Sequence, residues 1–149
     1  MEAIVDFATS ADLPAMAELL ATLFTLEADF RPDRDRQLRG LRLILDTPSI
    51  GRLFVVRQGN EVVGMANALI TVSTAQGTRV ALLEDVVLRQ DRRGQGLGRK
   101  LVEHVCAWAK SDGLTRVTLL ADRDNAPALA FYERLGFEPS AMVARRRAL

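Results

Sequence analysis

A glycine-dense basic segment, RRGQGLGRK, runs from Arg92 to Lys100. It lies between an apolar run that predicts a strand and an apolar periodicity that predicts a helix. Glycines let successive backbone N–H groups converge, and the N-terminus of a helix adds the positive end of its dipole. The segment is therefore suited to bind a phosphate or pyrophosphate. Residues 89–100 hold five basic residues and one acid, a local charge of +4 placed where an anion would bind.

The spacing of the glycines and their neighbours distinguishes between the known phosphate-binding motifs. A P-loop needs a lysine and then a serine or threonine directly after its last glycine, but Gly98 is followed by Arg99 and Lys100, which excludes it. A dinucleotide-binding GxGxxG would use Gly94 and Gly96, yet it needs a small residue where Arg99 stands. This interpretation stays open as a weaker one. A surface turn with glycines for steric reasons alone is a further alternative.

Two motifs together resemble a known family. The spacing Arg93-x-x-Gly96-x-Gly98, after a strand and at the start of a helix, resembles the acyl-CoA signature of the GNAT superfamily of N-acetyltransferases. Residues 125–137, NAPALAFYERLGF, resemble the family's Asn-x-x-Ala-x-x-Phe-Tyr helix that ends in Leu-Gly-Phe. The resemblance implies an enzyme that uses acetyl-CoA as co-substrate. A non-catalytic acyl-CoA-binding module of the same fold is the alternative.

The resemblance also assigns residues to the cofactor. Family members hold the CoA pyrophosphate mainly through backbone N–H groups of a loop that maps to Arg93, Gly94, Gln95, Gly96, Leu97, Gly98 and Arg99. They pair the pantetheine arm with a strand edge that maps to Val86, Val87 and Leu88. Residues 119–121 of the next strand would diverge and leave a V-shaped opening for the thioester. Asn125 either binds the pantetheine or caps its helix.

The implied chemistry is attack of an amine on a thioester, and three residues are its catalytic candidates. An alkyl amine has a reference pKa of about 10.4, so a base must accept a proton before attack. Glu84 and Asp85 are the only ionisable residues in the apolar run of residues 80–88; on a strand they point to opposite faces, and Glu84, which shares parity with Val86 and Leu88, is favoured. LEDVV at residues 83–87 also resembles glucosamine-phosphate acetyltransferases, in which both acids lie near the substrate. The pair could instead be buried carboxylates bonded to backbone or to an arginine.

Tyr132 occupies the family's acid position and is the chain's only tyrosine. A phenol can donate a proton or a hydrogen bond to the departing thiolate. Packing of this ring on the core is the other interpretation. For the acceptor, the resemblance implies that the loop after the first helix walls the pocket, which makes Phe24, Glu27, Asp29 and Phe30 candidates. The acceptor would be an amine of a small molecule or protein, and the two acids favour a cationic one.

The secondary-structure elements that position these residues are predicted from hydrophobic periodicity and from residues that favour turns and helix ends. The order predicts an α/β fold with a mixed sheet: a GNAT-like central twisted sheet flanked by helices, with a V-shaped splay between the fourth and fifth strands. Strands are expected at residues 4–7, 53–56, 62–72, 80–88 and 116–121. Helices are expected on the stripes of Leu13–Phe24 and Leu38–Leu45 and at residues 98–110 and 126–134, with Gly113 and Gly136 as C-terminal caps.

The amino-acid composition limits the classes of protein and of metal site that remain possible. The 149 residues, 48% hydrophobic and 26% charged with a net charge of +1, fit a single domain spanning residues 1–149 without nucleic-acid or membrane partners. No apolar run approaches the length of about 20 residues that spans a bilayer, so a cytoplasmic location is expected. The single Cys106 and single His104 exclude a disulfide, a Cys-based zinc site and a multi-His centre, and no metal is expected. Dimers are frequent in the resembled family, so a homodimer is one assembly it allows.

Overall fold

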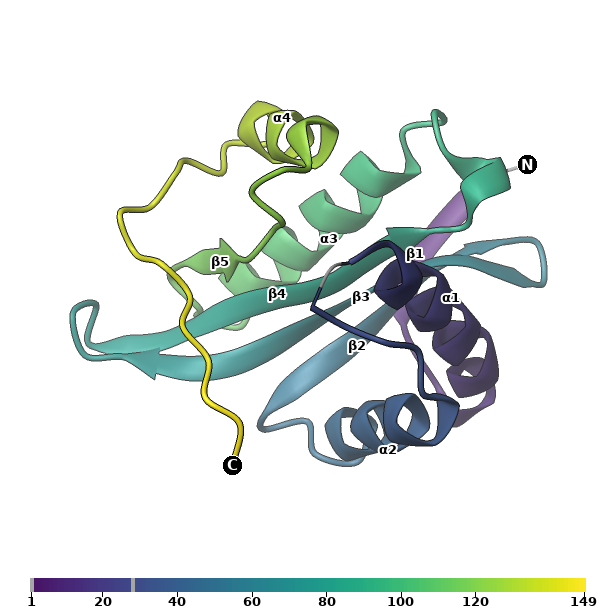
Figure 1. The fold of residues 1–149 in the computed structure, drawn as a ribbon, viewed down its shortest axis with the longest axis horizontal. Helices are drawn as coiled ribbons and strands as arrows, with labels where there is room; N and C mark the ends of the chain where they lie inside the picture. Colours follow the sequence, from purple (N-terminus) through teal and green to yellow (C-terminus); the bar gives the residue numbers. More distant parts are fainter. Residues whose placement is uncertain (1, 28) are drawn as a thin grey trace.

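The computed structural model describes residues 2–27 and 29–149, and within them the chain forms a five-stranded mixed sheet with helices on both faces (Figure 1). The strand order is β1-β2-β3-β4-β5, with antiparallel neighbours except for the parallel β4–β5 pair. The strands are β1 (Ala3–Phe7), β2 (Gly51–Gln58), β3 (Glu61–Ser73), β4 (Thr78–Leu88) and β5 (Val117–Leu119). The helices are α1 (Leu13–Leu26), α2 (Arg34–Leu45), α3 (Leu97–Ser111) and α4 (Ala126–Arg134), with short 3-10 turns η1 (Ser10–Asp12) and η2 (Gln90–Arg92).

The sheet is buried on both faces. On one face, Phe54 and Leu83 pack with Leu101 of α3, and α4 adds partly buried rings against this layer. On the other face, Val55 and Met65 pack with residues of α1 and α2. Successive side chains of a strand alternate between faces, so the continuous apolar runs of β2 and β3 supply both layers. The predicted mixed α/β architecture is confirmed.

The fourth and fifth strands pair only at one end. β5 is shorter than the predicted strand at residues 116–121, and it pairs in parallel with Ala81, Leu82 and Leu83. Beyond Leu83 no β5 residue in the described part of the chain pairs with β4. The edge of β4 from Glu84 to Leu88 therefore faces the opening between the strands, and the predicted splay is confirmed.

A β-bulge interrupts β4 at the pair of acids. Met65 of β3 pairs with Val87 and Asn67 pairs with Glu84, so Asp85 and Val86 together lie opposite the single residue between them on β3. Asp85 has a φ of +55°, a left-handed conformation that non-glycine residues rarely adopt. An extra residue reverses the side-chain alternation of everything that follows it.

Two glycines end helices as expected. Gly113 after α3 has φ +81° and Gly136 after α4 has φ +91°. The N–H of Leu114 donates to the carbonyl of Ala109, and the N–H of Phe137 donates to that of Tyr132, both over five residues. These are Schellman C-caps, which need a residue without a Cβ penalty at the left-handed position. In the described residues no helix has the length and apolarity to cross a membrane.

Candidate active site

The three glycines of the basic segment have two different roles. Gly94 and Gly96 have φ values of +79° and +78°, and Gly96 is the N-cap of α3. Left-handed positions of this kind turn successive N–H groups toward one side. Gly98 allows close packing instead, because a Cβ there would lie 3.3 Å from Cζ of Phe131. The loop therefore leads directly into the first turn of α3, whose N–H groups have no partner within the helix.

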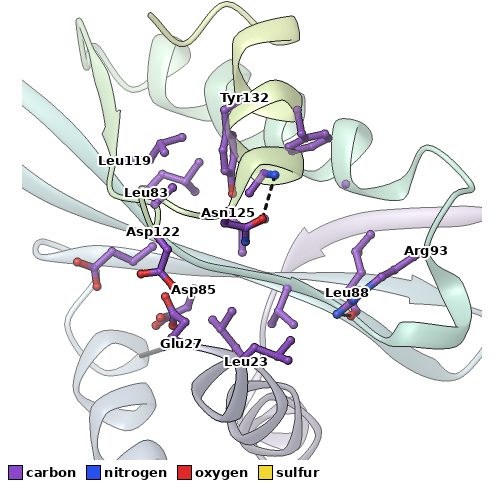
Figure 2. A pocket seen from close by; sticks show the side chains of 18 of the residues that line it. Leu23, Glu27, Leu83, Asp85, Leu88, Arg93, Leu119, Asp122, Asn125 and Tyr132 are labelled. Atoms are coloured by element: carbon purple, nitrogen blue, oxygen red, sulfur yellow. Dashed lines mark hydrogen bonds between the residues drawn. The ribbon is translucent and has the colours of Figure 1, made fainter. Parts of the chain in front are cut away.

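A cavity of about 610 Å³, here named the β4–α4 cavity, lies between the splayed strands (Figure 2). The free edge of β4, the glycine loop and the first two turns of α4 line it. It brings together nearly all the residues that sequence assigned to the cofactor: Val86, Val87, Leu88, Arg93, Gly94, Gly96, Leu97, Gly98, Arg99 and Asn125. A strand edge, the glycine loop and two arginines thus line one space.

Gln95 is the exception among those residues. It does not line the β4–α4 cavity, and Nε2 of Gln58 lies 3.4 Å from its Oε1, so the side chain turns toward the end of β2. Asn125, whose role was open, caps α4: its Oδ1 accepts a hydrogen bond of 3.2 Å from the N–H of Ala128 (Figure 2). It lines the cavity as well.

The local charge of +4 is less concentrated than the sequence suggested. Arg89 and Arg92 lie within 3.3 Å of Glu61 and also pair with Asp91. Lys100 donates to the carbonyl oxygen of Ala3. Only two of the five basic residues, Arg93 and Arg99, line the cavity, and Arg93 bends back to the carbonyl of Leu88 at 3.4 Å.

A second cavity of about 810 Å³, here named the α1–α2 cavity, lies between these helices and the sheet. Three of the four predicted acceptor residues, Phe24, Asp29 and Phe30, line it. Glu27 does not; it lines the β4–α4 cavity, because it lies at the last turn of α1 under the opening of the sheet (Figure 2). The two cavities share Glu84 and Asp85, which line both.

The bulge explains how both acids reach that position. The expectation that they point to opposite faces, with Glu84 on the side of Val86 and Leu88, is wrong. Val86 and Leu88 pack with Leu83 on the α3 side, whereas Glu84 pairs with Asn67, whose side chain lines the α1–α2 cavity. A regular strand would have separated the carboxylates, and the inserted residue places them side by side.

Asp85 is held by a neighbouring amide in a buried position. Nδ2 of Asn67 donates to its Oδ2 at 2.6 Å. Burial, followed by repulsion from Glu84, raises the pKa of Asp85 to about 6, although the hydrogen bond from Asn67 lowers it. At neutral pH this carboxylate is mainly ionised, yet close to the pH at which it takes up a proton.

Tyr132 points from α4 into the β4–α4 cavity above the acids (Figure 2). Its ring packs edge-on against Phe131 and Phe137, with centroids 5.1 and 5.8 Å apart. Burial and the negative charge of Glu27 raise the pKa of Tyr132 to about 12, so the phenol keeps its proton at neutral pH. Burial and the neighbouring Asp122 and Asp85 also raise the pKa of Glu27. The pKa of Tyr132 therefore depends on the charge of Glu27, and the pKa of Glu27 depends on the charges of Asp85 and Asp122.

Three residues of the site were missed by sequence reasoning. Asp122 lines the β4–α4 cavity just past the end of β5, and Asn67 lines the α1–α2 cavity. Arg146 near the C-terminus lies 2.8 Å from Asp29 and 5.4 Å from the ring of Phe30, so the terminal basic run reaches the loop after α1. Only Asn67 had a local signal, as a lone amide in the apolar run of residues 62–72.

Comparison with known proteins identifies the family. The Acetyltransferase (GNAT) family profile matches residues 13–137, from the start of α1 to the second residue after the C-cap of α4. The chain belongs to the GNAT acetyltransferase family.

Relatives of this GNAT chain act on different amines. It is 34% identical over 89 residues to glucosamine 6-phosphate N-acetyltransferase of Trypanosoma brucei brucei, a match that covers 59% of this chain and 58% of that one. It is 28% identical over 135 residues to aminoglycoside N(6')-acetyltransferase type 1 of Acinetobacter genomosp. 13, covering 88% and 92%. The chain thus spans less than two thirds of the trypanosome relative.

The GNAT fold is also seen in solved structures. An integron cassette protein from the mobile metagenome of Cole Harbour Salt Marsh matches with a TM-score of 0.85 and 26% identity, covering 97% of this chain and 90% of that one. The agreement extends beyond the two motifs to the N-terminal half, which carries no signature in sequence. The whole described chain therefore forms the GNAT fold.

Proposed function

We propose that this GNAT protein transfers an acetyl group from acetyl-CoA to a cationic primary amine. The observation that carries the proposal is the meeting of two cavities at Glu84 and Asp85. One cavity has the lining that a nucleotide thioester needs, and the other is a separate space for an acceptor. A carboxylate at the junction is within reach of both the thioester and the acceptor amine.

The residues of the β4–α4 cavity fit acetyl-CoA. The left-handed Gly94 and Gly96 and the first turn of α3 present N–H groups to a pyrophosphate, with Arg93 and Arg99 beside them. The unpaired edge of β4 at residues 86–88 can bind an amide-containing arm as an added strand would. When bound, acetyl-CoA supplies a thioester whose C–S bond breaks as the amine nitrogen bonds to the acetyl carbon.

Asp85 is the proposed base, in place of Glu84. Its pKa of about 6 is matched to accepting a proton near neutral pH, and its left-handed bulge position fixes it between the cavities. Oδ2 is held by Asn67, so the proton of the ammonium group goes to the carboxylate that the protein has already oriented. Glu84 keeps a supporting part, because its charge raises the pKa of Asp85.

Tyr132 is the proposed partner of the leaving sulfur. With a pKa of about 12 it is a weaker acid than a thiol, whose reference pKa is about 8.5. Donation of a hydrogen bond from its hydroxyl to the thiolate is therefore favoured over complete transfer of a proton. After the attack, the amine nitrogen releases a second proton. This proton can pass through the Tyr132 hydroxyl to the sulfur.

The charge around the junction supports a cationic acceptor. Four carboxylates and two guanidinium groups line the α1–α2 cavity: Asp29, Asp33, Glu84, Asp85, Arg31 and Arg36. Asp29 and Asp33 are salt-bridged to Arg146 and Arg36, so the negative charge that an amine would meet is that of Glu84 and Asp85. Glu27 and Asp122 add two acids on the other side of the junction. Among the relatives' named substrates, aminoglycosides fit this field better than a sugar phosphate does.

A two-stage experiment tests the proposal. Calorimetry measures binding of acetyl-CoA, and thiol release is then followed with a panel that includes kanamycin, spermidine, a lysine peptide and glucosamine 6-phosphate. We expect saturable binding and thiol release that cationic amines stimulate. Absence of saturable binding contradicts the proposal. Binding with slow hydrolysis that no amine stimulates points to a non-catalytic acyl-CoA-binding module.

A further inference from the structure

Asn67 is a buried amide with one unused acceptor. It lies in the middle of β3 and is only 2% exposed. Its neighbours Ala66 and Ala68 pack in the layer on the α3 side, so its own side chain lies on the opposite face, where it lines the α1–α2 cavity. Apolar residues dominate the rest of this strand segment, and a lone amide contributes less to packing than they do.

The hydrogen bond to Asp85 fixes which way the amide is turned. An ionised carboxylate only accepts hydrogen bonds, so Asn67 must present its NH₂ group to Oδ2 of Asp85, at 2.6 Å. Oδ1 is then directed away from Asp85. It is buried and has no hydrogen-bond partner among residues 2–27 and 29–149. A buried carbonyl without a donor is unfavourable, which points to a donor that the protein itself does not supply.

We infer that Oδ1 of Asn67 accepts a hydrogen bond from the nitrogen of the acceptor amine, which makes Asn67 a specificity-determining residue for primary amines. The inference rests on the proposed function and deepens it. A primary ammonium group has three N–H donors, so it can bond to Oδ1 and to the Asp85 carboxylate at the same time. A tertiary ammonium group carries the same charge with a single N–H and can satisfy only one of them.

A second buried amide in the same cavity provides a matched control. Gln37 is 7% exposed and also lines the α1–α2 cavity. Both ends of its amide are paired within the protein: Nε2 donates to the carbonyl of Ala17, and Oε1 accepts from the N–H of Asp33, each at 2.8 Å. Gln37→Leu therefore removes a buried amide of this cavity without removing an acceptor that a ligand could use.

The test compares butylamine with N,N-dimethylbutylamine, titrated into the whole ¹⁵N-labelled protein without acetyl-CoA so that no transfer occurs. We expect the wild type and Gln37→Leu to bind the primary amine about tenfold more tightly, a ratio that one hydrogen bond can supply. Asn67→Leu should reduce this ratio to less than about twofold, because loss of one acceptor removes the advantage of extra N–H donors.

Damage to the fold would weaken both amines and leave the ratio unchanged, so the ratio separates the hydrogen bonding of Asn67 from loss of the fold. An unchanged ratio in Asn67→Leu, or an equal loss in Gln37→Leu, overturns the assignment. The outcome is separate from that of the proposed function. Amine discrimination through Asn67 without acetyl transfer supports this assignment and contradicts the transfer, whereas transfer with an unchanged ratio overturns only the role of Asn67.

Discussion

Nδ2 of Asn67 donates a 2.6 Å hydrogen bond to Oδ2 of Asp85, across a point where two residues of β4 lie opposite one residue of β3. The bulge turns the acid toward the acceptor side, and the amide holds it there. Asp85 consequently lines both cavities, as the neighbouring Glu84 does. The catalytic proposal depends on this pair more than on any residue of the two sequence motifs.

Asp85→Asn should abolish most of the turnover. An amide cannot accept the proton of the ammonium group, and loss of a general base lowers kcat by about 10² to 10⁴-fold. Binding of acetyl-CoA should change little, since the loop and the strand edge remain. Glu84→Gln is the matched comparison and should have the smaller effect; equal losses in the two variants would contradict the choice of Asp85.

The pH dependence of the wild-type reaction rate should reveal the titration of Asp85. The carboxylate acts as a base only when ionised, so kcat/KM should fall as the pH drops through the Asp85 pKa of about 6 of the free protein. In Asn67→Leu the hydrogen bond that lowers this pKa is lost, and the acidic limb should move to higher pH. Profiles of kcat/KM for the amine against pH check both statements. An acidic limb that stays in place would exclude Asp85 as the titrating base.

Gly96→Glu should eliminate most of the affinity for acetyl-CoA. It puts a negative side chain at the N-cap of α3, where the pyrophosphate is expected, and repulsion there should weaken binding by at least about tenfold. Gly77→Glu is a matched control, because Gly77 has a similar φ of +70° and open space around it, in the distant β3–β4 turn. Calorimetry on both variants separates backbone strain from loss of the site.

Tyr132→Phe should lower kcat with little change in the dissociation constant of acetyl-CoA. The ring contacts with Phe131 and Phe137 remain, and only the hydroxyl is lost. A fall in kcat of about 10² is the size expected for a donor to the leaving group. Steady-state kinetics combined with calorimetry measures the two quantities. If kcat stayed at the wild-type value, the hydroxyl would have no part in the reaction.

The stability of the fold should depend on the ion pair of Asp12 and Arg57. Asp12 is 5% exposed, and its two oxygens each lie 2.6 Å from a guanidinium nitrogen of Arg57, which holds the pKa of Asp12 below its usual range. The stabilisation is therefore complete above the unfolded pKa of about 3.9 and is lost as the pH falls through the lower folded value. Asp12→Asn should destabilise the protein by about 1 to 3 kcal/mol near pH 7.

Chemical denaturation between pH 2 and pH 7 measures this effect. The difference in unfolding free energy between wild type and Asp12→Asn should shrink at the acidic end, where the wild-type carboxyl also becomes neutral. A difference that is constant over this range would show that the ion pair does not couple to folding.

The parts of the site that sequence predicted are those with local causes. The loop at residues 93–98 and the caps at Gly113 and Gly136 depend on glycine backbone conformations, which a motif records directly. The hydrophobic periodicity of the sequence located the helices and most strands. These features could be predicted without information on which segments pack against them.

The parts that sequence missed depend on pairing between distant segments. No pattern within residues 80–88 announces the bulge, because it is a register shift relative to β3, and it reversed the parity that had favoured Glu84. Arg89 and Arg92 pair with Glu61 and Lys100 donates to the carbonyl of Ala3, both in distant segments, so the local charge overstated the field at the cavity. Asn67 reaches the site only through the order of the sheet, and Glu27, predicted for the acceptor pocket, lines the β4–α4 cavity instead.

The most direct test of the central claim is the stoichiometry of transfer from acetyl-CoA labelled with ¹³C in the acetyl group, for wild type and Asp85→Asn with the best amine of the panel. The account predicts one N-acetylated amine, labelled with ¹³C, for each CoA released by the wild type. It also predicts almost no product from Asp85→Asn, even though this variant binds acetyl-CoA normally. Wild-type turnover that releases CoA without labelled amine, or an Asp85→Asn variant as fast as wild type, would contradict it.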